Sequence, residues 1–393
     1  MKQPPTIPGK FALVVLATLA SACEGEPALL HEHLRRGDQA LAEGRYAQAM
    51  SAYGHARELA PTSPRVQRAQ MWTRVHIMAD NPSHASAESL EDIAYEAQIL
   101  LATENPTPAR TAVCLAAQGN VLARRGDFDG ARTKLGEAVK ADSTSPIAHA
   151  ALGTLLMGKR EFAAEAKAEL ELALKHEPPS VAALLALGQI ALGEGDTAGA
   201  AARFETALRS QDDPTIRTML GKARLQQSRH DDAAVQFERA TIADPKSADA
   251  WSGLGQALLG ASRLEEAEQA LRTAMSLRAD ESTAIAYGFT LARLKKSDQA
   301  LSVFGQVLAQ NPGAASALYG AGVSSEDLGR PNQALDYYRR VLALAAAGPQ
   351  KPLIEELQKE SKARLDALQS AATASAPPSA SSAVVVAPPP RSR

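Results

Sequence analysis

The sequence predicts an all-α protein built from repeated helical hairpins, and three observations support this prediction. Glycines recur at steps of 33 to 35 residues through the middle of the chain, and small and large apolar residues follow them at fixed distances. Aromatic residues make up only 4% of the 393 residues, and alanine supplies much of the hydrophobic content, which suits closely packed helices better than β-sheets. Prolines mark the joints between units, where the first turn of a helix tolerates them.

Each unit contains a glycine, and we call this set the ladder glycines: Gly119, Gly153, Gly188, Gly221, Gly255, Gly288 and Gly322. An alanine follows each of them about twelve residues later. Four residues after that alanine comes a large side chain: Leu135, Leu170, Phe204, Phe237, Leu271, Phe304 and Tyr338. A small or β-branched residue follows three positions further on. Four sets in register over seven units exclude chance and indicate a true repeat.

The stretch Trp251-x-x-Leu254-Gly255-x-x-Leu258, followed by Ala267 and Leu271, resembles the pattern of the tetratricopeptide repeat family. That resemblance implies a 34-residue helix–turn–helix unit and a right-handed α-solenoid of about nine repeats over residues 28–348. Small residues let two helices approach closely, so we expect Gly255 to face the second helix of its repeat near Ala267. Gly260 is off the ladder, and we expect it to tolerate alanine.

The chain divides into a solenoid with additional segments at both ends. Residues 64–111 predict a degenerate repeat with an insertion, whose helices we expect at 64–79 and 86–103. Ala94 and Leu101 keep the second-helix pattern there. Residues 349–369 predict a capping helix, and residues 370–393 predict a disordered tail rich in alanine, serine and proline. The apolar stripe expected on the capping helix consists of Leu353, Ile354, Leu357, Leu365 and Leu368.

Residues 1–22 predict a signal peptide, because two lysines precede a run of about ten apolar residues that is too short to span a bilayer. The following Cys23 ends a segment, Ala20-Ser21-Ala22-Cys23, that resembles a bacterial lipobox. The resemblance implies that Cys23 is lipidated, that residues 23–27 form a short linker, and that the protein is anchored in the bacterial cell envelope, on the periplasmic side of the outer membrane. Leu19 lies four residues before the cysteine instead of the usual three, and Ala20-x-Ala22 also suits ordinary signal peptidase.

Composition and motifs argue against several classes of function. The net charge is −2 and no basic stripe is present, so we expect no nucleic-acid partner. The segment "GLGQAL" at Gly253 lacks the third glycine of a dinucleotide loop. His31 and His33 lie two residues apart, which places them on different faces of a helix, and Cys114 lies in an apolar run typical of a buried residue. We therefore predict no enzyme, no cofactor and no metal.

The resemblance also implies a binding surface. In the family the first helices line a concave groove, and the residue after each ladder glycine faces it. The candidate partner-binding residues are Asn120, Thr154, Gln189, Lys222, Gln256, Phe289 and Val323, with Tyr319 one helical turn before Val323. We expect these side chains to be exposed, neutral and polar in the middle repeats and apolar toward Phe289 and Tyr319. Lys222 is the only cation among these residues and those one turn before them, so the basic clamp with which some members capture a C-terminal carboxylate is missing.

These features predict a non-catalytic scaffold that binds a protein or peptide partner on its concave face and joins the membrane through its N-terminal lipid. An adaptor for assembling a membrane-associated complex fits this description, as in pilus, secretion, outer-membrane or polysaccharide-export machinery. The alternative is a periplasmic binding module for polysaccharide or a small ligand, in which Phe289 and Tyr319 form the platform.

Overall fold

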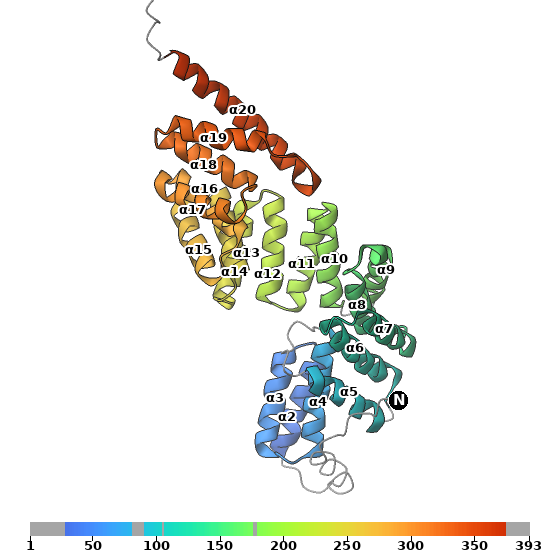
Figure 1. Ribbon diagram of the computed structural model, residues 1–393. Coiled ribbons are helices and arrows are strands. Elements are labelled where there is room, and N and C mark those ends of the chain that lie inside the picture. The colour runs from blue at the N-terminus through green and yellow to red at the C-terminus, as the bar shows by residue number, and fades with distance from the viewer. Residues whose placement is uncertain (1–27, 81–89, 104–105, 176–178, 375–393) are drawn as a thin grey trace, which may run out of the picture. The chain divides into compact units, whose positions relative to one another are not determined.

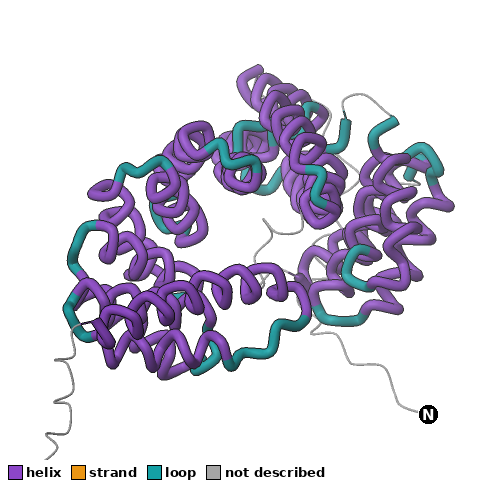
Figure 2. Tube along the Cα trace, turned by 90° about the horizontal axis from the view of Figure 1, so that it is seen from above, coloured by secondary structure: helices purple, strands orange, loops and turns teal. Residues whose placement is uncertain are grey.

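The computed structural model describes residues 28–80, 90–103, 106–175 and 179–374. These residues form the α-helices α2 to α20 and two short 3-10 helices, and they contain no strand (Figure 2). The predicted all-α solenoid is confirmed. No helix among these residues is long and apolar enough to cross a membrane. The predicted signal peptide, Cys23 and the part of the tail beyond Ala374 lie outside the described residues.

The chain divides into two compact units, which meet in the sequence between Asp212 and Asp213. Figure 1 labels their helices. The described part of unit 1 contains five helical hairpins. Their helices are α2 (Ala28–Ala42) with α3 (Tyr46–Leu59), α4 (Pro64–Asp80) with α5 (Leu90–Thr103), α6 (Pro108–Arg124) with α7 (Phe128–Ala141), α8 (Pro146–Leu156) with α9 (Ala163–Ala173), and α10 (Val181–Glu194) with α11 (Thr197–Ser210). A 3-10 turn at Arg160–Phe162 precedes α9.

Unit 2 contains four hairpins followed by a single helix. The hairpins are α12 (Pro214–Gln226) with α13 (His230–Ala243), α14 (Ala248–Gly260) with α15 (Leu264–Leu277), α16 (Glu281–Arg293) with α17 (Ser297–Gln310), and α18 (Ala315–Asp327) with α19 (Pro331–Leu342). Helix α20 (Lys351–Ala374) packs on α18 and α19. Each hairpin contacts the next one in its unit, so the apolar face of a hairpin is buried by its neighbour.

Local sequence signals begin the helices where the repeat requires them. Pro146 and Pro214 are the first residues of α8 and α12, where the missing N–H costs nothing. The residue just before each proline caps the helix with its side chain. Ser145 accepts a hydrogen bond from the Ala148 N–H at 3.3 Å, and Asp213 accepts one from the Thr215 N–H at 2.7 Å. These bonds satisfy backbone donors that the first helical turn leaves unpaired.

The ladder glycines are where the two helices of a hairpin pack most closely. A Cβ added to Gly255 would overlap the side chain of Leu271, which is fully buried. Gly255 therefore faces the second helix of its repeat as expected, and the side chain nearest to it is that of Leu271 on α15, one turn after Ala267. The reason is that the leucine side chain points back across the crossing and fills the space the glycine leaves. The equivalent glycines meet the large side chain of their own second helix in the same way.

A second glycine acts across the boundary between repeats. A Cβ on Gly253 would overlap the ring of Phe237, which belongs to the preceding hairpin and also lies against Gly221. Phe304 lies between Gly288 and Gly320 in the same manner. The G-x-G pattern in α14 is thus a packing feature, in which one glycine receives the side chain of its own repeat and the other that of the previous repeat.

The expectation for Gly260 is wrong. A Cβ at this position would overlap the imidazole of His230, the first residue of α13. Gly260 is exposed on one side, but its other side is covered by the preceding repeat. A glycine outside the ladder positions can therefore still be packed against a neighbouring side chain.

The degenerate repeat contains α4 where a helix was predicted at 64–79 and α5 within the predicted range 86–103, of which residues 86–89 lie outside the described residues. The buried face of α5 differs from the predicted one. The buried side chains of α5 are Ile93, Ala97 and Leu100, whereas Ala94 and Leu101 are only partly buried. The buried face is displaced by one residue, which is about 100° around a helix. Offsets taken from the regular repeats therefore do not identify the core of α5.

Helix α20 closes the last repeat. Ile354 and Leu357 are buried as predicted, but Leu353 is 44% exposed, so the stripe is narrower than the sequence indicated. The Gln358 amide donates to the carbonyl oxygens of Leu344 at 2.8 Å and Val341 at 3.3 Å, which caps the carboxyl end of α19. The helix continues to Ala374, four residues past the point where the disordered tail was expected to begin at Ser370.

We predict that Gly255→Ala lowers the free energy of unfolding by about 1–3 kcal/mol, because the new methyl group overpacks against Leu271. Gly305→Ala is the matched control. Gly305 also lies within a helix of unit 2, but nothing lies within 4 Å of a Cβ there. This control is expected to gain up to about 1 kcal/mol from helix propensity. Urea unfolding followed by circular dichroism measures both, and equal shifts for the two variants would contradict this packing.

Candidate functional site

The predicted partner-binding residues occupy the first helices of seven hairpins, but the structure gives them different environments. Thr154 on α8 and Gln189 on α10 are exposed in unit 1. In unit 2, Lys222 on α12 is exposed and Gln256 on α14 is half-buried. Val323 on α18 is also half-buried. The common spacing therefore does not produce one uniform surface.

The expectation that Asn120 is exposed is wrong. Its side chain is buried, and its amide donates to the carbonyl oxygens of Met78 at 2.8 Å and Ala79 at 3.0 Å. These carbonyls belong to the last turn of α4, where the backbone has no partner within its own helix. Asn120 is thus a structural residue that joins α6 to the end of α4. The degenerate repeat, with its longer first helix, causes this difference from the other first helices.

Phe289 and Tyr319 are half-buried and already engaged within unit 2. The Phe289 ring packs edge-on against Phe304, with centroids 5.2 Å apart. The Tyr319 hydroxyl accepts a hydrogen bond from Arg364 Nε of α20 at 3.2 Å, and the same guanidinium pairs with Glu326 at 2.8 Å. The apolar end that the sequence indicated is therefore covered in part by α20.

A cavity of about 340 Å³ lies along α14 within unit 2. Lys222 and Leu225 of α12 line one side, and Ser252 and Gln256 of α14 line another. The link between α15 and α16 contributes Arg278 and Asp280, and the first turn of α16 contributes Ser282. This cavity brings together two of the predicted residues, Lys222 and Gln256, and we take it as the candidate functional site.

Hydrogen bonds hold the polar side chains of the cavity in one connected chain. The Gln256 amide donates to Ser252 Oγ at 3.2 Å, and Ser252 Oγ lies 2.8 Å from Thr283 Oγ1. The Thr283 hydroxyl in turn donates to Asp280 Oδ2 at 2.9 Å. Asp280 also accepts from the Thr283 N–H at 2.9 Å and so caps α16. This network fixes the Gln256 amide with its carbonyl oxygen available as an acceptor.

The charges around the cavity leave one cation unused. Arg278 bonds to Asp249, which raises the pKa of Arg278, and its Nε lies 3.8 Å from Asp280 Oδ2. Burial acts to raise the pKa of Asp280, but hydrogen bonds from Thr283 and Ser282 together with the Arg278 charge outweigh it and lower the pKa. Both groups are thus ionised at neutral pH. Lys222 has no ion-pair partner among the described residues, so it is available to a ligand.

This arrangement is suited to binding. A free ammonium, a fixed amide oxygen and a hydroxyl network can pair with carbonyl, carboxylate or N–H groups of a ligand. Among the residues that the structure describes, no three His, Cys, Asp or Glu side chains are grouped so that they could hold a metal ion. Cys114 is buried at 1% exposure on α6, as expected of a small apolar residue.

Sequence reasoning missed Arg278, Asp280 and Asp249. The segment Asp280-x-x-Thr283 carries a usable signal, because an aspartate three residues before a helical position is typical of an N-cap. Arg278 has no such signal. It precedes α16 in the link between two helices, and the link's path, which the repeat period does not specify, carries its side chain to the cavity.

These features define an all-α repeat protein whose candidate site is a polar binding surface. A family model described as a tetratricopeptide repeat matches residues 116–181, 152–215, 185–234, 218–282 and 290–352. Because these segments together cover more than half of the chain, the chain belongs to the tetratricopeptide repeat family. No curated protein matches the chain in a sequence comparison.

Solved structures share the fold. The chain is similar to the Cut9–Hcn1 hetero-tetramer of the APC/C, with 12% identity, coverage of 84% of this chain and 76% of that one, and a TM-score of 0.52. It also matches a tetratricopeptide repeat protein from Parabacteroides merdae, with 17% identity, coverage of 64% and 99%, and a TM-score of 0.48. The protein YrrB, described as having an unusual peptide-binding site, matches with 22% identity, coverage of 51% and 97%, and a TM-score of 0.41. At these identities the likeness concerns the fold alone.

We predict that Asp280→Asn destabilises unit 2 by about 0.5–1.5 kcal/mol, because it removes the negative charge beside Arg278 and the oxygen that accepts from the Thr283 hydroxyl. The asparagine side chain still has one oxygen that can cap α16. The pKa of Asp280 is lower in the folded state than in the unfolded chain, so its contribution is present above pH 3.8 and is lost as the pH falls through the folded value. Stability measured against pH should therefore fall less steeply in acid for Asp280→Asn. Glu265→Gln, at an exposed carboxylate of α15 in the same unit, is the control, and an equal effect from it would show that the carboxylate of Asp280 is not the cause.

Proposed function

We propose that this chain is a non-catalytic scaffold that binds a protein partner at the cavity of unit 2. The observation that carries the proposal is that one cavity of about 340 Å³ is lined both by Lys222, which has no ion-pair partner among the described residues, and by Gln256, whose amide is held by a hydrogen bond to Ser252. The family to which the chain belongs consists of repeat scaffolds that display such side chains on their first helices. An extended segment of a partner can place its backbone against Gln256 and an acidic or carbonyl group against Lys222.

The alternative of a polysaccharide platform at Phe289 and Tyr319 receives no support. A sugar platform needs an aromatic face open to solvent, but Phe289 packs on Phe304 and Tyr319 bonds to Arg364. Removing α20 from Tyr319 would break the pair between Arg364 and Glu326 as well. We therefore do not place a ligand at this end of unit 2.

We further propose that the scaffold is anchored in a bacterial envelope and acts as an adaptor in assembling a membrane-associated complex. The signal-like residues 1–22 and Cys23 of the lipobox-like segment support this part of the proposal. Pilus, secretion, outer-membrane and polysaccharide-export machineries are the candidate assemblies. The partner identified at the unit 2 cavity decides among them.

Site-specific photo-crosslinking in intact cells tests the binding surface. A photo-reactive residue in place of Gln256 is expected to crosslink one defined partner, and Lys222→Glu in the same chain is expected to reduce the yield. The matched control places the same group at Ile242, which is 74% exposed on α13 of the same unit. Equal yields at the two positions, or no product at either, would contradict the proposed surface.

The anchor is tested separately. Cys23→Ser should abolish incorporation of a labelled fatty acid and leave the protein uncleaved or soluble, because the several acyl chains of a bacterial lipoprotein are what hold it to a membrane. Fractionation and metabolic labelling measure both effects. A correctly processed, unlabelled protein that still sediments with membranes would rule out anchoring through Cys23.

A further inference from the structure

A second cavity of about 430 Å³ lies in unit 1 and is lined by none of the residues proposed above. Helix α5 contributes Tyr95 and Gln98, which are three residues apart and share one face. Helix α6 contributes Gln118 and Leu122, which share a face in the same way. Its volume lies in the range of about 300–1,000 Å³ found for small-molecule sites. The rotated register of α5 creates this arrangement, because it turns Ala94 toward the cavity instead of the core.

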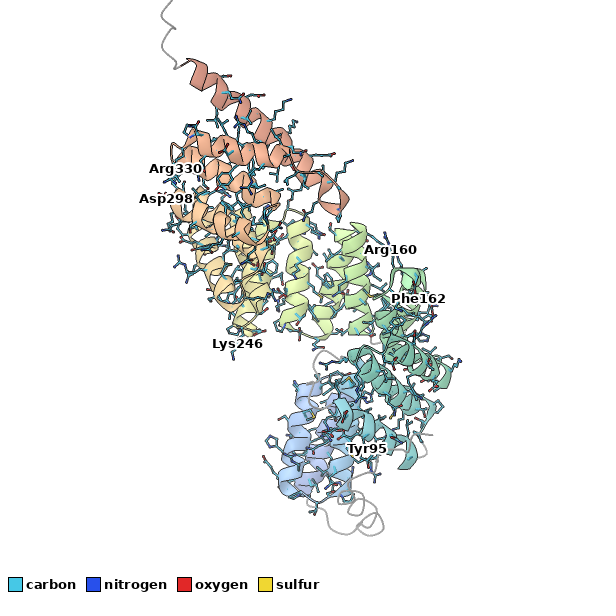
Figure 3. All side chains as sticks on the ribbon, in the orientation of Figure 1. Tyr95, Arg160, Phe162, Lys246, Asp298 and Arg330 are labelled. Atoms are coloured by element: carbon cyan, nitrogen blue, oxygen red, sulfur yellow. The ribbon has the colours of Figure 1, made fainter. Side chains whose placement is uncertain are left out.

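Tyr95 differs from the other aromatic residues that line or surround the repeats of unit 1. It is 53% exposed, and it makes no hydrogen bond or aromatic ring contact with another described residue. Figure 3 labels its position. By contrast, Phe128 stacks on Phe162 at 5.9 Å, and Trp72 packs edge-on against His76 at 5.1 Å. An exposed aromatic ring leaves apolar surface in contact with water, and a ligand that packs on the ring can bury this surface.

The amides beside Tyr95 are also unused. The side chains of Gln98 and Gln118 make no hydrogen bond within the part of the chain that the structure describes. Each offers two N–H donors and one carbonyl acceptor, and both lie on the walls of the cavity. The floor between them is apolar and includes the buried Val121.

The two basic residues that line the cavity each lie near an acidic side chain. Arg125 lies 3.5 Å from Glu91, and Lys134 lies 2.7 Å from Glu137. An ionic ligand would have to compete with these pairs. A neutral ligand can use the ring and the amides without disturbing them.

We propose that this cavity binds a neutral saccharide chain. The C–H face of one sugar ring packs on the exposed ring of Tyr95, and the hydroxyls of that sugar or its neighbour pair with Gln98 and Gln118. A pyranose is the ligand that matches a flat aromatic face flanked by groups that both donate and accept hydrogen bonds. A peptide anchor fits less well, because an apolar side chain is usually enclosed on several sides, whereas Tyr95 stands exposed. The site is independent of the partner surface in unit 2.

Calorimetric titration of the full chain with defined probes tests the proposal. The neutral probes are maltohexaose, cellohexaose and chitohexaose, and the charged probe is an oligogalacturonate. At least one neutral probe should bind, and Tyr95→Ala should weaken it by tenfold or more. Tyr95→Phe keeps the ring face and should retain most of the affinity. The double variant Gln98→Ala with Gln118→Ala should also weaken binding.

Gln310→Ala is the matched control, since Gln310 is an exposed amide on α17 of unit 2. It should leave saccharide binding unchanged. Circular dichroism should show that each variant is folded, as expected for substitutions at exposed or half-buried positions. The proposal is overturned if no neutral probe binds at millimolar concentration, if only the charged probe binds, or if Tyr95→Ala binds as well as the parent. None of these outcomes bears on photo-crosslinking at Gln256, so the two proposals fail separately.

Discussion

The contact between a glycine on the first helix of a repeat and a large side chain on its second helix is the constraint on which the rest of the structure depends. Phe237 is fully buried between Gly221 of its own hairpin and Gly253 of the next one. A single side chain thus sets the separation of two helices within a repeat and of two repeats. Close packing of this kind leaves no room for an added methyl group, which explains why glycine is present despite its cost of about 1 kcal/mol to a helix.

The same contact positions the candidate site. Because Gly221 and Gly255 must face the second helices of their repeats, the residues that follow them are turned by about 100° and face away from those helices. Those residues are Lys222 and Gln256, and both line the cavity along α14. Packing fixes the backbone positions of Lys222 and Gln256, but it does not require these particular side chains. The exposed positions of the repeat are therefore where function can differ between members of one fold.

Sequence reasoning identified the fold well because the period is repeated and the large side chains keep their register. It was less successful where the repeat is irregular. Asn120 looks equivalent to Gln256 in the sequence, but the longer α4 brings its last carbonyls within reach of the Asn120 amide. Tyr95 was not singled out, since the displaced register of α5 is not visible in spacing alone. Arg278 reaches the cavity from a link between helices, and a period predicts helix faces rather than the paths of links.

A double-mutant cycle on Gly253 and Phe237 tests the central claim most directly. Gly253→Ala places a methyl group against the outer atoms of the Phe237 ring, and Phe237→Leu removes those atoms. The account predicts that the two changes are coupled, so that Gly253→Ala costs at least about 1 kcal/mol less in the Phe237→Leu background than in the parent. Free energies of unfolding that add to within about 0.5 kcal/mol would show that the glycine and the ring act independently, and would contradict it.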